Sequence, residues 1–152
     1  MKKFELTSEF VTFLGKKLFR IKALVSFGDV KEGELGGLVE KEENLDQSGN
    51  AWVYGDARVY GDAWVSGDAW VSGDARVQNC RDYSATSCFG SENRTTTFFR
   101  TKDGGISVRC GCFYGTLNEF REKVKERHGD SRLAKEYLML ADLMEFRLSK
   151  DE

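Results

Sequence analysis

Apolar and polar residues recur in six-residue units between residues 51 and 78. Each unit places Ala and Val two positions apart with a Trp or Arg between them, and a Gly-Asp pair separates one unit from the next. Alternation over three residues predicts a short strand with Ala and Val inward and the long side chain outward. Gly tolerates positive φ and Asp hydrogen-bonds its own backbone, so each Gly-Asp pair predicts a corner. The chain is therefore expected to coil.

These units resemble the hexapeptide repeat of left-handed β-helix proteins, in which an aliphatic residue is followed four positions later by a small one. Val53 followed by Ala57 is one such pair. In that family three hexapeptides form one triangular coil, so the resemblance implies that residues 18 positions apart stack. The expected stacks are Trp52 with Trp70 and Arg58 with Arg76, with Trp64 on the third face. Because five repeats make less than two coils, the flanking segments or other copies of the chain must cover the ends.

Aromatic side chains on the outer face of such a coil are expected to be buried in a contact, because contiguous exposed apolar patches usually mark contact surfaces. The expected interface residues are Trp52, Tyr54, Trp64 and Trp70. Trp52 and Trp70 are also expected to stack ring on ring. Three interpretations remain open: the flanking segments cover these side chains, the subunits of a homo-oligomer bury them, or they form a platform for a ligand.

The flanks of the repeats have different patterns. Residues 4–27 alternate loosely and predict two or three strands with a hairpin. Residues 29–46 are acidic, and Val39 and Leu45 are six apart, which suggests a degenerate first coil that begins the repeats; its acidic side chains are interpreted as a solvated capping loop. Residues 79–94 are polar and are expected to be irregular.

The C-terminal part predicts a β-hairpin followed by two helices. Residues 95–101 and 106–114 are rich in β-forming residues and flank a Gly-Gly turn. Thr116 and Glu119 form a capping box that begins a helix, and Gly129 ends it. A second helix is expected over residues 131–149. The residues expected to face the core are Leu117, Phe120, Val124, Leu133, Tyr137, Leu138, Ala141, Met144 and Leu148.

The fold class expected from these patterns is mainly β with α. It combines a short left-handed β-helix with an N-terminal β cap and a C-terminal module of one β-hairpin and two helices. The corresponding domains are residues 1–28, 29–78 and 79–152.

A second resemblance concerns the chain from Thr95 onward. The runs Thr-Thr-Thr-Phe-Phe-Arg-Thr-Lys-Asp-Gly and Cys-Gly-Cys-Phe-Tyr-Gly-Thr-Leu-Asn-Glu-Phe, and the later His-Gly-Asp, are similar to the C-terminal module of small bacteriophage and prophage proteins. Those proteins often carry hexapeptide-like repeats in front of this module. The resemblance implies a phage setting and a β-helix, but no particular reaction.

Composition narrows the classes of function. The chain of 152 residues is 40% hydrophobic and 32% charged, with a formal net charge of −2. No apolar run is long enough to span a membrane and no charged-then-apolar leader begins the chain, so a cytoplasmic protein is expected, in the host cell if it is phage-encoded. A slightly acidic chain argues against duplex nucleic acid as a partner. No cofactor is expected.

Basic residues concentrate between residues 76 and 109 and suggest a site for a small anion such as a nucleotide. Guanidinium groups match phosphate in a bidentate way, and hydroxyl and amide groups add further donors. The candidate ligand-binding residues are Ser91, Asn93, Arg94, Arg100, Lys102 and Arg109. The competing interpretation is a solvated hairpin.

An acyltransferase is the alternative, because hexapeptide acyltransferases use a His as general base. His128 is the only His, and it lies at the predicted end of a helix rather than in the repeats, where that family keeps its base. A helix-ending role is favoured, because an imidazolium suits the dipole at a helix C-terminus. No catalytic residue is assigned.

The cysteines suggest no metal site. Cys110 and Cys112 have a one-residue gap, and Cys80 and Cys88 a seven-residue gap, whereas zinc sites prefer gaps of two to four. Buried free thiols are favoured over zinc and over a disulfide.

The function favoured by the sequence is a non-enzymatic, oligomeric binding protein of phage type, with a trimer as the assembly expected from the hexapeptide family. It would act by contact with a host protein or a small anionic, nucleotide-like ligand. Counter-defence is the expected use, by blocking a host protein or sequestering a nucleotide signal. The alternative is an acyltransferase-like enzyme on the hexapeptide scaffold.

Overall fold

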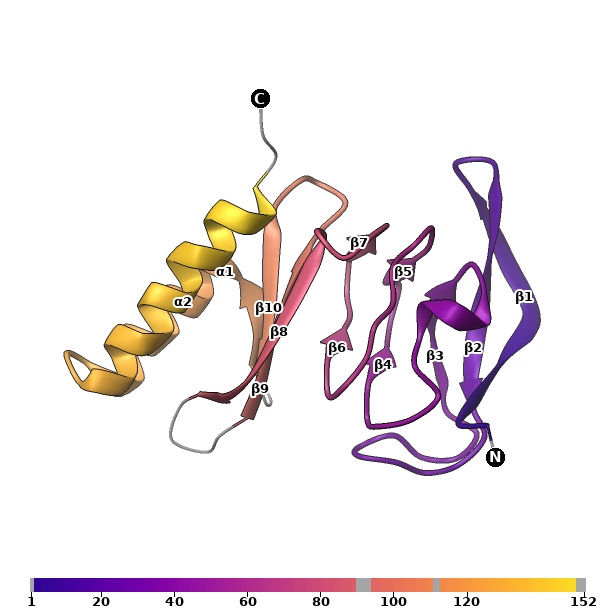
Figure 1. The fold of residues 1–152 in the computed structure, drawn as a ribbon, viewed down its shortest axis with the longest axis horizontal. Helices are drawn as coiled ribbons and strands as arrows, with labels where there is room; N and C mark the ends of the chain where they lie inside the picture. The colour runs from indigo at the N-terminus through magenta and orange to yellow at the C-terminus, as the bar shows by residue number, and fades with distance from the viewer. Residues whose placement is uncertain (1, 90–93, 111–112, 150–152) are drawn as a thin grey trace.

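The computed structural model of the chain describes residues 2–89, 94–110 and 113–149 (Figure 1). An N-terminal hairpin lies at one end of the long axis and two helices lie at the other, with the repeats and a four-stranded sheet between them. The elements in chain order are β1 (Phe4–Phe13), β2 (Lys16–Ala23), β3 (Leu35–Val39), η1 (Glu42–Asn44), β4 (Trp52–Val53), β5 (Arg58–Val59), β6 (Trp70–Val71), β7 (Arg76–Val77), β8 (Tyr83–Phe89), β9 (Arg94–Arg100), β10 (Ile106–Cys110), β11 (Phe113–Thr116), α1 (Leu117–His128) and α2 (Arg132–Leu148).

The repeats stack in the register that the sequence predicts. Trp52 pairs with Trp70 in a parallel ladder, and Arg58 pairs with Arg76. Every Ala and Val of the repeats is buried in one cluster, so their predicted inward orientation is confirmed. At the corners, Gly55 and Gly61 have φ of 66° and 63°, the left-handed region that glycine adopts most readily.

The predicted left-handed β-helix is nevertheless wrong. The strands of the described residues form three separate sheets, and none of these is closed or a solenoid. Strands β4 and β6 form a two-stranded sheet of their own, whereas β5 and β7 extend the sheet that begins with the N-terminal hairpin, in the order β1-β2-β3-β5-β7. On the third face, the described residues form only an isolated bridge, Leu45 with Val65.

The physical reason lies in the short strands and in the flanks. Each repeat contributes at most two residues to a ladder before the next corner, so the paired segments of the repeats are short and lie in separate sheets. The hairpin β1–β2 adds long antiparallel pairing, and β3 joins it to β5. Leu45 and Val65 are 20 positions apart rather than 18, as are Val39 and Val59, so the segment before the repeats follows a different spacing.

The three tryptophans have different environments, although outward positions were predicted for all of them. Trp52 is fully buried, and its ring meets Phe27 edge-on at 5.3 Å between centroids. Trp70 is half-buried, and its ring contacts Tyr54 at 6.2 Å. Within the described residues these contacts replace the expected Trp52–Trp70 ring stack. Trp64 stays 57% exposed.

The C-terminal sheet has the order β11-β10-β9-β8, and its β9 and β10 confirm the predicted hairpin, as they pair antiparallel. The single second strand predicted over residues 106–114 is wrong, because the chain reverses after Cys110 and β11 pairs antiparallel with β10. The expectation of an irregular segment over residues 79–94 is wrong for β8, which pairs with β9. Adjacent residues of β9 face opposite layers: Phe98 packs in the cluster with α1 and α2, and Phe99 packs against the repeats. The sheet is therefore the middle layer between the helices and the repeats (Figure 1).

Both helices begin and end as the sequence predicts. The Thr116 side chain accepts a hydrogen bond from the Glu119 amide at the start of α1, and Gly129 ends this helix. Ser131 caps α2. The buried side of α2 includes Leu140, which was not predicted to face the core, while the predicted core residues Leu133 and Leu138 are only partly buried. No helix within the described ranges is long and apolar enough to cross a membrane.

Candidate functional site

The predicted anion-binding residues do not converge on one site. Ser91 and Asn93 lie outside the described residues, and Arg94 is the first residue of β9. Arg100, at the end of β9, lies with its Nε 3.4 Å from Asp82 Oδ1 and donates from Nη2 to the Ser149 carbonyl at 3.2 Å. These contacts of Arg100 therefore lie within the C-terminal segment, residues 79–152.

Arg109 lies on the other face of the same sheet. It pairs with Thr97, whose hydroxyl oxygen accepts a hydrogen bond from the Trp70 amide, and its guanidinium lies 4.6 Å from the centre of a Trp70 ring. Lys102 is exposed in the hairpin turn, where its amide donates to the Asp74 carbonyl. Because Arg100 and Arg109 face opposite layers, they cannot hold one small anion together.

The residues considered for catalysis and metal binding make contacts within the fold and do not form a metal site among the described residues. His128 is the last residue of α1, at the helix end where the sequence placed it, and its ring stacks on Tyr137 at 6.0 Å between centroids. Cys80 is exposed, against the expected burial, and the Cys110 thiol accepts a hydrogen bond from Thr96. Cys112 and the Cys88 side chain are outside the described part. Within that part, no three His, Cys, Asp or Glu side chains are grouped to hold a metal ion.

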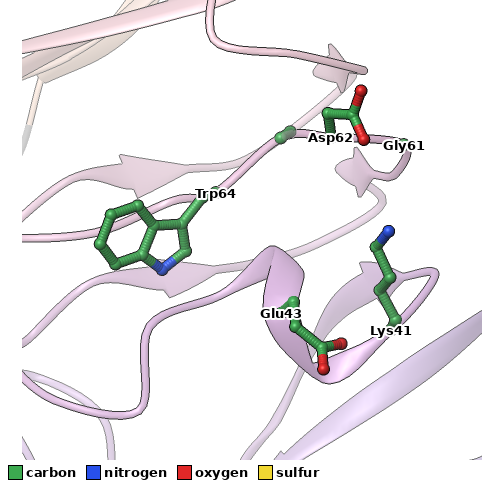
Figure 2. Close-up of a pocket in the computed structure, with 6 residues that line it drawn as sticks. Lys41, Glu43, Gly61, Asp62 and Trp64 are labelled. Atoms are coloured by element: carbon green, nitrogen blue, oxygen red, sulfur yellow. The ribbon is translucent and has the colours of Figure 1, made fainter.

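The structure instead points to a cavity of about 440 Å³ beside Trp64, lined by Lys41, Glu43, Gly61, Asp62, Ala63 and Trp64. Figure 2 shows the indole on one side of this cavity, Asp62 and Lys41 on the opposite side, and Glu43 on η1 between them. The four long side chains are all exposed. We call this surface the Trp64 cavity.

Asn44 holds together the two chain segments that line the Trp64 cavity. Its side chain is fully buried, and its Oδ1 accepts hydrogen bonds from the amides of Glu40 and Lys41 at 3.1 and 3.0 Å. Its Nδ2 donates to the carbonyls of Gly61 and Ala63 at 3.3 and 2.9 Å. One side chain therefore joins η1 to the corner of the repeat that carries Asp62.

Trp64 itself is held through its backbone. The Tyr83 hydroxyl donates to the Trp64 carbonyl at 2.7 Å, and burial raises the pKa of Tyr83, so this phenol stays protonated as a donor at neutral pH. The indole is left exposed on a fixed backbone. An indole face attracts cations, and within the described residues neither Glu43 nor Asp62 forms an ion pair. The arrangement suits a cationic group.

The sequence predicted Trp64 as an interface residue but missed Lys41, Glu43 and Asp62 as its neighbours. Asp62 was interpreted as a corner residue and the acidic segment as a solvated loop. The available signal was the six-residue spacing of Val39 and Leu45, which aligns this segment with the repeats.

A further surface that the sequence missed lies on the outer side of α2. Met139, Leu143 and Phe146 are 71%, 55% and 82% exposed. Their spacing of four and three residues places them on one stripe of the helix, opposite the buried stripe.

No protein-family model matches the chain, and a search of the curated proteins finds no match.

Proposed function

We propose that this protein is a non-enzymatic binding protein that contacts a protein partner through the Trp64 cavity. The observation that carries the proposal is the exposure of Trp64 on a fixed backbone, while Trp52 and Trp70 are covered by other parts of the chain. Trp is enriched at the energetically dominant positions of protein interfaces, because its large ring buries much area with few rotatable bonds.

The partner group that fits best is the side chain of an arginine or lysine. It would lie against the indole of Trp64 and meet the carboxylates of Glu43 and Asp62, which have no ion-pair partner among the described residues. Desolvation in an interface strengthens both interactions.

The biological setting remains the one that the sequence resemblance implies. A phage-encoded protein of this kind would bind a host protein, and blocking a defence factor is the predicted use. The acyltransferase-like alternative rested on a β-helix scaffold that the described sheets do not form, and no observation favours it.

The first test uses two short peptides that differ only in arginine against citrulline, its neutral isostere. In NMR titrations the Trp64 indole N–H signal should shift with the arginine peptide and not with the citrulline peptide. Trp64→Ala should abolish binding, and Asp62→Asn should weaken it at least about threefold, the loss expected for one exposed charge pair.

The matched control is Asp68→Asn, which removes the corresponding corner carboxylate of the next repeat and should bind like the unmodified protein. Capture from host lysate extends the test to whole proteins. A partner retained by the unmodified protein and by Phe146→Ala, but lost with Trp64→Ala, would support the proposal. Equal binding of both peptides, or equal capture by all variants, would refute it.

A further inference from the structure

Two arginines lie side by side on the outer face of the five-stranded sheet. Arg58 on β5 and Arg76 on β7 are direct partners in a parallel ladder, in which neighbouring strands are about 4.8 Å apart. Both side chains are half-buried. The repeat therefore brings two guanidinium groups together on one surface.

The ring of Phe13, at the end of β1, contacts both guanidinium groups and also the ring of Tyr60. The guanidinium carbons of Arg58 and Arg76 lie 4.7 and 5.6 Å from the centre of the Phe13 ring. The same ring meets Tyr60 edge-on at 5.3 Å. Tyr60 is more than nine-tenths buried, and among the described residues its hydroxyl has no hydrogen-bond partner.

The guanidinium group of Arg58 has no hydrogen-bond acceptor among the described residues. In the described part of the chain its guanidinium makes no hydrogen bond and no ion pair, and its Nε is buried without a partner. Arg76 donates from Nη1 to three backbone carbonyls, the closest being that of Ala75 at 2.8 Å. By contrast, Arg20 on β2 has Glu9 at 3.3 Å and two carbonyl acceptors.

The nearby carboxylates only partly offset the charge of the pair: burial and Arg58 lower the pKa of Arg76 by more than Asp74 and Asp56 raise it. Asp56 and Asp74 are exposed at the corners, and neither forms an ion pair with Arg58 or Arg76 within the described ranges. Asp82 is engaged by Arg100. Burial, and then the positive charge of Arg58, lower the pKa of Arg76, so the two like charges disfavour each other.

We propose that Arg58, Arg76 and the Tyr60 hydroxyl form a binding site for a phosphate group. A phosphate monoester carries between one and two negative charges at neutral pH and three acceptor oxygens, so it offsets two guanidinium groups and accepts from both at once. A carboxylate carries a single charge and two oxygens. The site is separate from the Trp64 cavity and from the anion-binding residues that the sequence suggested.

The test is isothermal titration of the full chain with inorganic phosphate, and with acetate at equal ionic strength. Saturable binding of phosphate, at least about tenfold tighter than acetate, is expected from the difference in charge. Arg58→Met and Arg76→Met keep the unbranched stem beside Phe13 and should each weaken phosphate binding at least tenfold, and Tyr60→Phe about threefold. Further titrations with adenosine monophosphate and O-phosphoserine identify the kind of molecule that supplies the phosphate.

The control is Arg127→Met, which removes an exposed charge on α1 and should leave binding unchanged. Melting temperatures give a second test. Arg58→Met removes the like-charge contact, so it should melt at a higher temperature than the unmodified protein when phosphate is absent. It should also lose the rise in melting temperature that phosphate causes in the unmodified protein. Phosphate binding that is equal in Arg58→Met, Arg76→Met and Arg127→Met, or acetate binding as tight as phosphate binding, would overturn the proposal.

Discussion

The most unusual single residue is Lys3, a buried cation at the start of the chain. Its Nζ donates to the Ala51 carbonyl at 2.8 Å and to those of Ser48 and Gly49 at 3.4 Å, and it lies 4.7 Å from the centre of the Phe27 ring. Burial lowers the pKa of Lys3 to about 8, because charge is costly away from water.

This pKa predicts a pH dependence of stability. Between the folded-state pKa of about 8 and the ordinary value of 10.5, the unfolded chain keeps a proton that the folded chain releases. The free energy of unfolding should therefore rise with pH in this window, by up to ~1.4 kcal/mol per pH unit. Urea unfolding across the window measures it, and Lys3→Met should remove the rise.

The raised pKa values of Tyr60 and Tyr83, both caused first by burial, act in the opposite direction at higher pH. The measurement therefore belongs below pH of about 9.5, before these phenols ionise. A rise of the same slope in Lys3→Met would show that another group is responsible.

At the scale of elements, β3 determines how closely the N-terminal hairpin approaches the repeats. Gly36 and Gly37 are both buried in β3. A Cβ at Gly36 would lie 2.6 Å from Trp52 Cζ2 and from the Val53 carbonyl oxygen. This strand can cover Trp52 because Gly36 leaves room for the indole, while Gly37 lies close to Val53 and the Ala57 carbonyl oxygen.

Gly36→Ala should accordingly lower the free energy of unfolding by about 1–3 kcal/mol, the usual cost of overpacking a core. Chemical denaturation followed by tryptophan fluorescence gives the change. The matched control is Gly105→Ala in the exposed hairpin turn, where the nearest atom would be 3.5 Å away, and its effect should be small. Equal losses of free energy of unfolding in the two variants would show that the close contact of Gly36 with Trp52 does not determine the stability.

At the scale of the whole molecule, the outer stripe of α2 offers a surface for a second copy of the chain. In an antiparallel pair of α2 helices, Met139 of one copy would lie opposite Phe146 of the other, and the two Leu143 side chains would face each other. The stripe is thus complementary to itself, as a twofold interface requires. A dimer is the assembly that this stripe favours, whereas the hexapeptide family suggested a trimer.

Light scattering after size-exclusion chromatography tests the assembly. The unmodified protein should elute with twice the mass of the chain, and Phe146→Glu should give a monomer, because it places an unpaired carboxylate against Met139 of the other copy. Trp64→Ala should remain a dimer. A dimer that persists in Phe146→Glu would place the interface elsewhere, and a monomeric unmodified protein would exclude self-association through α2.

Local patterns predicted much of the fold and less of the candidate site. The corner glycines, the inward Ala and Val residues and the capping box of Thr116 act over a few residues, so the sequence contained their signal. The stripe of α2 was predicted on its buried side only. The Trp64 cavity joins residues 41–43 to residues 61–64, and no local pattern indicates that Asn44 holds them together.

The register in which Trp52 pairs with Trp70 and Arg58 pairs with Arg76 follows from the repeat alone, because a fixed period repeats the same distance along the chain. The sheet that each strand joins, and the tryptophan that stays exposed, depend on contacts between distant segments. The Trp64 and Trp70 units have the same six residues, Gly-Asp-Ala-Trp-Val-Ser, and therefore the same local preferences. Their different environments come from the flanks: β9 and β10 cover Trp70 and β3 covers Trp52, whereas Trp64 stays exposed.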